Sequence, residues 1–164
     1  MIRLQKIDAK NVWDVLDLKL KREQKHFVAS NEISIVQAYA AIETECRAFP
    51  FAVYNDKKVV GFLMVCYNEG AFYEMDGNVP PSALVNNYSI CRIMIDKRYQ
   101  RRGYGRAALL CALDFIRTWP CGKADYCEIS YEPDNTVAKT LYASLGFVEN
   151  GELDGDETVA VLKL

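Results

Sequence analysis

The feature that most constrains the fold is a short basic, glycine-rich segment, residues 100–106, that stands between a strand pattern and a helix pattern. The residues before it, from Tyr88 to Ile95, are typical of a strand. After it, apolar side chains recur at helical spacing from about Gly103 to Thr118, and another strand pattern runs from about Ala124 to Tyr131. A strand, a helix and a second strand in this order predict a right-handed parallel crossover.

Antiparallel strands are predicted on both sides of this crossover. Residues 51–54 and 59–67 are strand-like and are joined by turn formers at 55–58, which predicts a tight hairpin. Alternating residues at Ile2 and Leu4 predict a first strand, and residues 147–164 predict a terminal hairpin. The loop at 68–87 lacks periodicity and could border a substrate site.

Three further helices are predicted. The first covers Val12 to Leu20, the second follows a cap at Ser34, and the third runs from about Asn135 to Leu145, where Gly146 ends it. The expected apolar face of the second helix consists of Ile35, Tyr39, Ile42 and Cys46, with Pro50 after its end. The 164 residues suit one domain, residues 1–164, so we expect a single α/β domain with a mixed sheet flanked by helices.

Charge and hydropathy exclude several classes of partner. Lys and Arg number 20 and Asp and Glu 22, a net charge of −2 that gives no overall attraction to nucleic acid or anionic membrane. No apolar run approaches the roughly 20 residues of a membrane span. The N-terminus also lacks an apolar leader, so a cytoplasmic location is expected.

The six cysteines are interpreted as reduced core residues, because four of them fall in apolar strand or helix patterns and none forms a C-x-x-C pair. With His26 as the only histidine, interpreted as structural, no metal site is expected.

The glycines of the basic segment can hold an anion. Gly103 and Gly105 have no side chain to block close approach, so backbone N–H groups at a helix start can surround a phosphate. Five cations stand within ten residues, namely Lys97, Arg98, Arg101, Arg102 and Arg106. The alternative is a glycine turn beside solvated charges.

Two other nucleotide motifs fit less well. Gly103, Gly105 and Ala108, with Asp125 about 20 residues on, satisfy a dinucleotide-binding fingerprint. The strands before it look antiparallel, only one crossover follows and no room is left for a substrate domain. A P-loop is excluded because no Gly-Lys-Ser/Thr follows the glycines.

Q-R-R-G-Y-G-R resembles the acetyl-CoA motif of the GNAT N-acetyltransferase superfamily. A second signature, N-T-V-A-K-T-L-Y-A-S-L-G-F at 135–147, is also similar to that superfamily. IMIDKRYQRRGYG and ISYEPDN are similar to segments of bacterial spermine/spermidine (diamine) acetyltransferases. The resemblance implies a centrally splayed sheet and acetyl transfer to a primary amine, a polyamine first.

The resemblance also implies roles for individual residues. Tyr142 would act as general acid on the leaving thiolate. Asn135 and Tyr142 are seven residues apart on one predicted helix, so both face the same side. Asn135 would bind the pantetheine arm, although helix capping alone would also explain it. The remaining implied acetyl-CoA residues are Ile93, Met94, Ile95, Gln100, Arg101, Arg102, Gly103, Tyr104, Gly105 and Arg106.

The base and the substrate residues are less constrained. The base is unassigned among Glu74, Glu128, Tyr131 and Glu132, and the three glutamates are the substrate candidates. A polycation would also favour Glu23, Glu32 or Asp76 near the amine. The acidic residues between 149 and 157 are interpreted as a solvated hairpin turn.

Several alternatives stay open at this point. The domain could bind acyl-CoA as a non-catalytic sensor, or it could acetylate an antibiotic, amino acid, peptide or protein amine. Many members of the superfamily are homodimers, so a dimer paired through the C-terminal strand is one arrangement that the resemblance implies.

Overall fold

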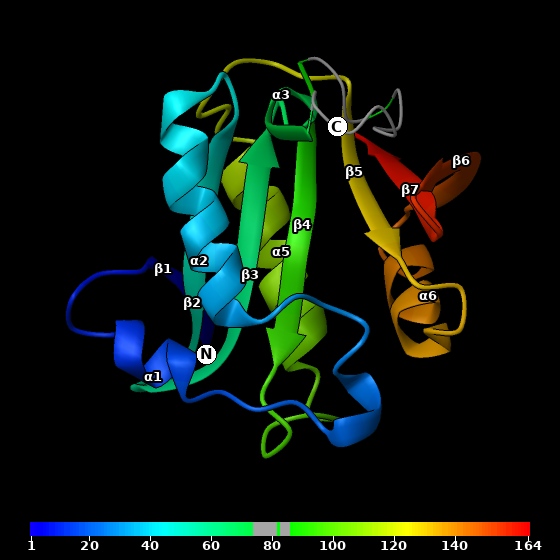
Figure 1. Ribbon diagram of the computed structural model, residues 1–164. Coiled ribbons are helices and arrows are strands. Elements are labelled where there is room, and N and C mark those ends of the chain that lie inside the picture. The colour runs from blue at the N-terminus through cyan, green and yellow to red at the C-terminus, as the bar shows by residue number, and fades with distance from the viewer. Residues whose placement is uncertain (74–81, 83–85) are drawn as a thin grey trace.

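The computed structural model describes residues 1–73, 82 and 86–164, so the candidate residues Glu74 and Asp76 lie outside the described residues. The strands are β1 (Ile2–Lys6), β2 (Arg47–Asn55), β3 (Lys58–Tyr67), β4 (Tyr88–Ile95), β5 (Tyr126–Tyr131), β6 (Val148–Asp154) and β7 (Glu157–Lys163). They form one mixed sheet in the order β1-β2-β3-β4-β5-β7-β6 (Figure 1).

Helices cover both faces of this sheet (Figure 1). The described helices are α1 (Val12–Leu16), η1 (Arg22–Gln24), α2 (Asn31–Ala40), η2 (Ala41–Glu43), α3 (Gly70–Tyr73), α5 (Tyr104–Ile116) and α6 (Thr136–Ala143). One apolar core lies between the sheet and α5 with α6, and a second lies between the sheet and α1 with α2. The predicted α/β class is therefore confirmed.

Among the described helices, none is long and apolar enough to cross a membrane.

The predicted hairpin is the pair of β2 and β3. Asn55 pairs with Lys58, and Asp56 takes a positive φ of 54°, as tight hairpin turns require. β2 begins at Arg47, so the expectation that Pro50 merely follows a helix is wrong. Pro50 lies just beyond Phe51, the last residue paired with β1, and sheets tolerate proline at such an edge.

The second helix begins earlier than predicted. The Oγ of Ser30 accepts the N–H of Ile33 at 3.3 Å, so Ser30 and not Ser34 is the cap. Ser34 is buried inside α2 and donates to the Ser30 carbonyl at 2.9 Å. Both serines fit a capping pattern, but only Ser30 has the extended backbone that a cap needs. The first helix is also shorter than predicted, because α1 ends at Leu16.

The predicted apolar face of this helix is only partly confirmed. Ile35 packs against the second core, but Tyr39 and Ile42 are 76% and 65% exposed, and Cys46 is buried but lies beyond the helix. The other residues of α2 and η2 turned toward the protein are small or polar, namely Asn31, Ser34, Ala38 and Ala41. The Asn31 amide donates to the carbonyl of Val15 at 2.8 Å, so a buried polar contact joins α2 to α1.

The crossover from β4 through α5 to β5 contains the central splay. β4 and β5 pair in parallel only at Tyr88 with Cys127 and Ser89 with Glu128, and then diverge (Figure 1). The register of β3 and β4 shifts immediately afterwards, between the pairs Cys66–Ser89 and Met64–Arg92. Two β4 residues there oppose one β3 residue, which is a β-bulge, and a bulge bends its strand. The splay implied by the resemblance is confirmed.

The C-terminal elements follow the predicted order. Gly146 has a φ of 96°, and the next N–H, of Phe147, donates to the Tyr142 carbonyl at 3.2 Å, so α6 ends with a left-handed glycine. β6 and β7 form the predicted terminal hairpin, and β7 pairs antiparallel with β5. The pairing of β7 with β5 carries Glu157 next to the central splay.

Candidate active site

A cavity of about 600 Å³ opens where β4 and β5 diverge. Its walls come from the second half of β4, the start of α5, one side of α6 and the segment before α2 that includes residues 26–29. The cavity therefore extends from the last paired residues of the two strands to the helix start of α5. Volume and position suit a long, thin ligand that lies between the strands.

The helix start of α5 forms one end of the cavity. Gly103 is its N-cap with a φ of 76° and has no side chain to cap the first N–H groups of the helix. A Cβ at Gly105 would come within 3.6 Å of Leu141 and 3.9 Å of Ile95, across the cavity. Arg101 and Arg106 line this end. The site fits the pyrophosphate of coenzyme A, since backbone N–H groups, the helix dipole and two cations all favour an anion.

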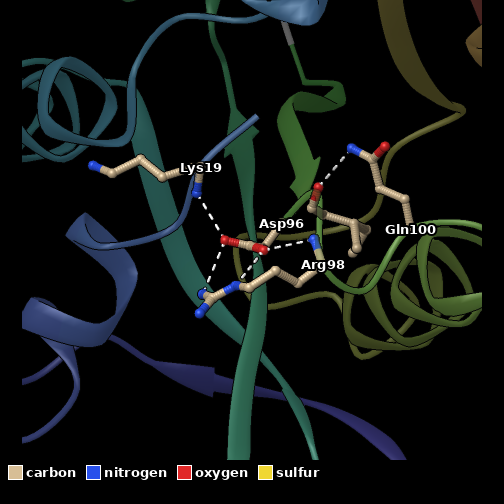
Figure 2. Close-up of polar contacts among 5 residues, drawn as sticks. Lys19, Asp96, Arg98 and Gln100 are labelled. Atoms are coloured by element: carbon tan, nitrogen blue, oxygen red, sulfur yellow. Dashed lines mark hydrogen bonds and ion pairs between the residues drawn. The ribbon is translucent and has the colours of Figure 1, made fainter. Parts of the chain in front are cut away.

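A buried carboxylate fixes the loop that leads into this helix (Figure 2). Asp96, immediately after β4, is fully buried. It accepts the backbone N–H of Lys19 at 2.8 Å, and from Arg98 the backbone N–H at 2.9 Å and two guanidinium N–H groups at 2.8 and 3.1 Å. Burial alone would raise the pKa of Asp96, but the bonds from Arg98 and Lys19 hold it below its usual value. The carboxylate thus joins the end of β4, the loop and the segment after α1.

Gln100 has a structural role in the same loop. Its amide donates to the Ile95 carbonyl and to the side chain of Gln24, both at 2.9 Å (Figure 2 draws the first). These bonds attach the loop to the strand end and to η1. Sequence reasoning considered Gln100 as a ligand residue, and it did not consider Asp96 or Gln24. The available signal for Asp96 was a charged residue directly at the end of an apolar strand.

Tyr142 and Asn135 both line the cavity from the side of α6, as their spacing predicts. Tyr142 is 7% exposed and packs edge-on against Tyr131, with ring centroids 5.5 Å apart. Burial, and then the charge of Glu157, raise the pKa of Tyr142, so its hydroxyl keeps its proton at neutral pH. Asn135 is the N-cap of α6, and its side chain accepts the Ala138 N–H at 3.1 Å.

Glu157 lines the opposite end of the cavity, and with Glu69 and Asp154 it interacts electrostatically with the buried Glu128. We call these four carboxylates, Glu69, Glu128, Asp154 and Glu157, the acidic cluster. Glu128 is 4% exposed, and its Oε1 has no hydrogen-bond partner among the described residues. Ser89 donates to Glu69, and Ser130 donates to Glu157, which lines the cavity with it. Burial raises the pKa of all four carboxyls, most strongly that of Glu128, where the charges of Glu69, Asp154 and Glu157 add to it. The charge of Arg92, which also lines the cavity, lowers the pKa of Glu69, Asp154 and Glu157 and so offsets part of this repulsion. A further cation would offset more of it.

Comparison with known proteins agrees with this geometry. Residues 13–147 match the model of the acetyltransferase (GNAT) family. The chain belongs to this family. Members transfer an acetyl group from acetyl-CoA, and the anion-binding end described above is where a GNAT protein would hold its pyrophosphate.

Individual GNAT relatives span the whole chain. The spermine/spermidine N(1)-acetyltransferase of Bacillus subtilis is 28% identical over 165 residues, which cover 99% of both chains. Among solved structures, aminoglycoside acetyltransferase AAC(6')-Ib in complex with coenzyme A matches with a TM-score of 0.73 at 12% identity, covering 99% of this chain and 95% of that one. The PaiA N-acetyltransferase of Thermoplasma acidophilum, also with coenzyme A, matches with a TM-score of 0.65 at 14% identity, covering 100% and 99%.

The structure gathers most of the predicted GNAT site residues around the cavity. Eleven line it: Ile93, Met94, Ile95, Gln100, Arg101, Gly103, Tyr104, Gly105, Arg106, Asn135 and Tyr142. Arg102 does not line it; its guanidinium lies 5.8 Å from the ring centroid of Tyr99. Glu128 lies buried beside it, and Glu132 is also absent from its walls.

One interpretation from the sequence needs correction. The acidic residues near the C-terminus are not simply a solvated turn, because Glu157 lines the cavity and Glu149 accepts the Tyr131 hydroxyl at 2.7 Å. His26, interpreted as structural, lies exposed at the cavity, with its Nε2 3.5 Å from the carboxylate of Asp134. Neither Glu69 nor Ser130 was predicted as a site residue from the sequence.

Proposed function

We propose that this GNAT protein acetylates a primary amine of a polyamine such as spermine or spermidine. The observation that carries the proposal is the acidic cluster, whose member Glu157 lines the end of the cavity away from the anion-binding helix start. A polyamine carries several ammonium groups, and a second ammonium needs carboxylates at a distance from the reacting nitrogen. The full-length relationship at 28% identity to a spermine/spermidine acetyltransferase supports the same acceptor class.

In this proposal the two ends of the cavity bind the two substrates. The N–H groups at the start of α5, with Arg101 and Arg106, hold the pyrophosphate of acetyl-CoA. The backbone of Ile93 to Ile95 pairs with the pantetheine arm, as an added strand would, in the gap that the splay leaves. One N–H of this strand stabilises the oxyanion, which typically contributes about 3 kcal/mol.

The chemistry is a direct attack. The neutral amine nitrogen forms a bond to the thioester carbonyl carbon, the carbon–sulfur bond breaks, and the Tyr142 hydroxyl gives its proton to the leaving thiolate. The acylated nitrogen then loses its extra proton to solvent, from which the Tyr142 oxygen regains one. The ammonium must first lose a proton. Glu157 is our candidate acceptor for it, because it lines the cavity and burial raises its pKa toward the working range.

The first test is a substrate panel. Purified protein is mixed with acetyl-CoA and spermine, spermidine, putrescine, aminoglycosides, amino acids or a lysine peptide, and thiol release is followed. We expect the largest kcat/KM for spermine or spermidine. Faster thiol release with an aminoglycoside or a peptide would identify that amine, and not a polyamine, as the acceptor. Acetyl-CoA binding without thiol release for any amine would favour a non-catalytic sensor.

A matched pair of variants tests the role of the acidic cluster. Glu157→Gln removes one charge at the cavity, and a hydrogen bond to a charged group contributes about 1.5–3 kcal/mol. Because Glu157 is also the candidate proton acceptor, we expect kcat/KM for spermidine to fall at least about tenfold, while the Kd for acetyl-CoA stays unchanged. The control is Glu43→Gln, an exposed glutamate in η2. Equal effects of the two variants on spermidine would remove the cluster from the acceptor site.

A further inference from the structure

A second group of chemically reactive side chains lies in the core on the α2 face of the sheet. Cys66 at the end of β3 and Cys91 at the bulge of β4 have their Sγ atoms 2.7 Å apart. The thiol of Cys46, which precedes β2, also bonds to the thiol of Cys66. One carboxylate oxygen of Glu69 and the Sγ atoms of Cys66 and Cys91 all lie within 4.8 Å of one another. We call Cys46, Cys66, Cys91 and Glu69 the thiol site.

The surroundings of the thiol site leave room for a small ion. A cavity of about 10 Å³ is lined by Cys46, Cys66 and Glu69, and it is separate from the larger cavity between the strands. This volume is close to the minimum for a single water molecule. Cys91 also lines the larger cavity, which gives solvent ions a route to the thiol site.

The ligand types of the thiol site suit a metal cation. Thiols that coordinate a metal are deprotonated outright, so a bound cation would hold the cysteines as thiolates.

We propose that the thiol site binds one Zn²⁺ ion through Cys66, Cys91 and Glu69, whose ligand atoms lie together, with the thiol of Cys46, which bonds to Cys66, as the fourth ligand. Three thiolates and one carboxylate supply the four soft and borderline ligands of a closed tetrahedral site. Each coordinated thiol gives up its proton to solvent as its sulfur–zinc bond forms, so binding strengthens as pH rises. The ligands come from the segment before β2, from β3, from the residue before α3 and from β4, and the ion would hold these elements together. This proposal does not depend on the acetylated substrate.

Cobalt titration of the reduced, metal-free protein tests the site. Co²⁺ takes the same tetrahedral ligands and gives a thiolate-to-cobalt absorption band in the near ultraviolet. We expect the band to saturate at one equivalent and to disappear when Zn²⁺ is added. Cys66→Ser and Cys91→Ser should each lose the band, while the matched control Cys111→Ser, in α5 and outside the site, keeps it.

Thermal unfolding provides a second readout, because a ligand that binds only the folded state raises Tm. Zn²⁺ should raise the Tm of the wild type and of Cys111→Ser, but not of Cys91→Ser. Acetyl-CoA binding by each variant shows that it is folded. Absence of the cobalt band in reduced wild type that still binds acetyl-CoA would overturn the proposal, and so would a band that persists in Cys66→Ser and Cys91→Ser.

Discussion

The two ends of the central cavity are built in different ways. The anion-binding end uses backbone: N–H groups at the start of α5, two glycines and a loop fixed by Asp96, all within residues 95–106. The acidic cluster uses side chains from the segment after β3, from β5 and from the β6–β7 turn, three regions that are far apart in sequence. A family can keep the first end constant and change the second, so acetyl-CoA binding and acceptor choice should respond to different substitutions.

The largest effect is expected where the two ends meet, at Tyr142. Tyr142→Phe removes the proton donor and keeps the ring that packs on Tyr131. We expect kcat to fall by about 10²- to 10⁴-fold, the usual contribution of a general acid, with little change in the Kd for acetyl-CoA. Stopped-flow thiol release and calorimetric titration measure the two quantities. Tyr126→Phe, at an exposed tyrosine, is the control. A parallel loss of acetyl-CoA affinity would reassign Tyr142 to packing.

The sequence predicts the anion-binding end well because its signals are local. Strand, basic glycine segment and helix follow one another, and the left-handed backbone at Gly103 occupies a position where glycine is expected. The same local signals do not predict which of Ser30 and Ser34 caps α2, because two serines four residues apart satisfy the same capping pattern. Only the extended backbone conformation at Ser30 distinguishes them.

The acidic cluster could not be predicted in the same way, because strand register creates it. Ser130 pairs with Val159 and Tyr131 with Thr158, which brings Glu157 beside β5. One local signal did exist: Glu128 and Ser130 alternate with the apolar residues Cys127, Ile129 and Tyr131, which indicates a polar face on a buried strand. The partners of that polar face, Glu69 and Glu157, are set by long-range pairing alone.

Asp96 tests how far the backbone-built end depends on one buried side chain. Asp96→Ala leaves donors from Lys19 and Arg98 without their acceptor, and a buried donor left unsatisfied typically costs about 1–3 kcal/mol. We expect a loss of that size in the free energy of unfolding, measured by urea denaturation, and weaker acetyl-CoA binding. Asp96→Asn should give an intermediate result if Asp96→Ala does not fold.

The control for Asp96 is Asp114→Ala, which removes an exposed carboxylate 3.6 Å from Arg117. Exposed pairs of this kind contribute about 0–1 kcal/mol. If Asp96→Asn bound acetyl-CoA as tightly as the wild type, the loop would hold its shape without this carboxylate, and the backbone-built end would be more robust than we infer.

Glu128 offers a pH test of the acidic cluster. Its folded-state pKa is raised well above 4.5, so the folded protein binds more protons than the unfolded chain over the interval between the two values. The free energy of unfolding should therefore fall as pH rises above 4.5 and level off above the folded-state pKa. Glu128→Gln should flatten this dependence, as urea denaturation at several pH values would show. Identical pH profiles for the two proteins would mean that Glu128 is less desolvated than its burial indicates.

The smallest expected effect concerns Asn135, where capping and ligand binding coincide. Asn135→Ala removes the bond to the Ala138 N–H and should lower the free energy of unfolding by about 1 kcal/mol. Asn135→Ser keeps a capping oxygen and should restore that stability, but it lacks the amide proposed to bind the pantetheine arm. Weaker acetyl-CoA binding in a stable Asn135→Ser protein would assign Asn135 to the ligand. Full recovery of both stability and affinity would limit Asn135 to its cap, and would make the acetyl-CoA end depend still more completely on backbone.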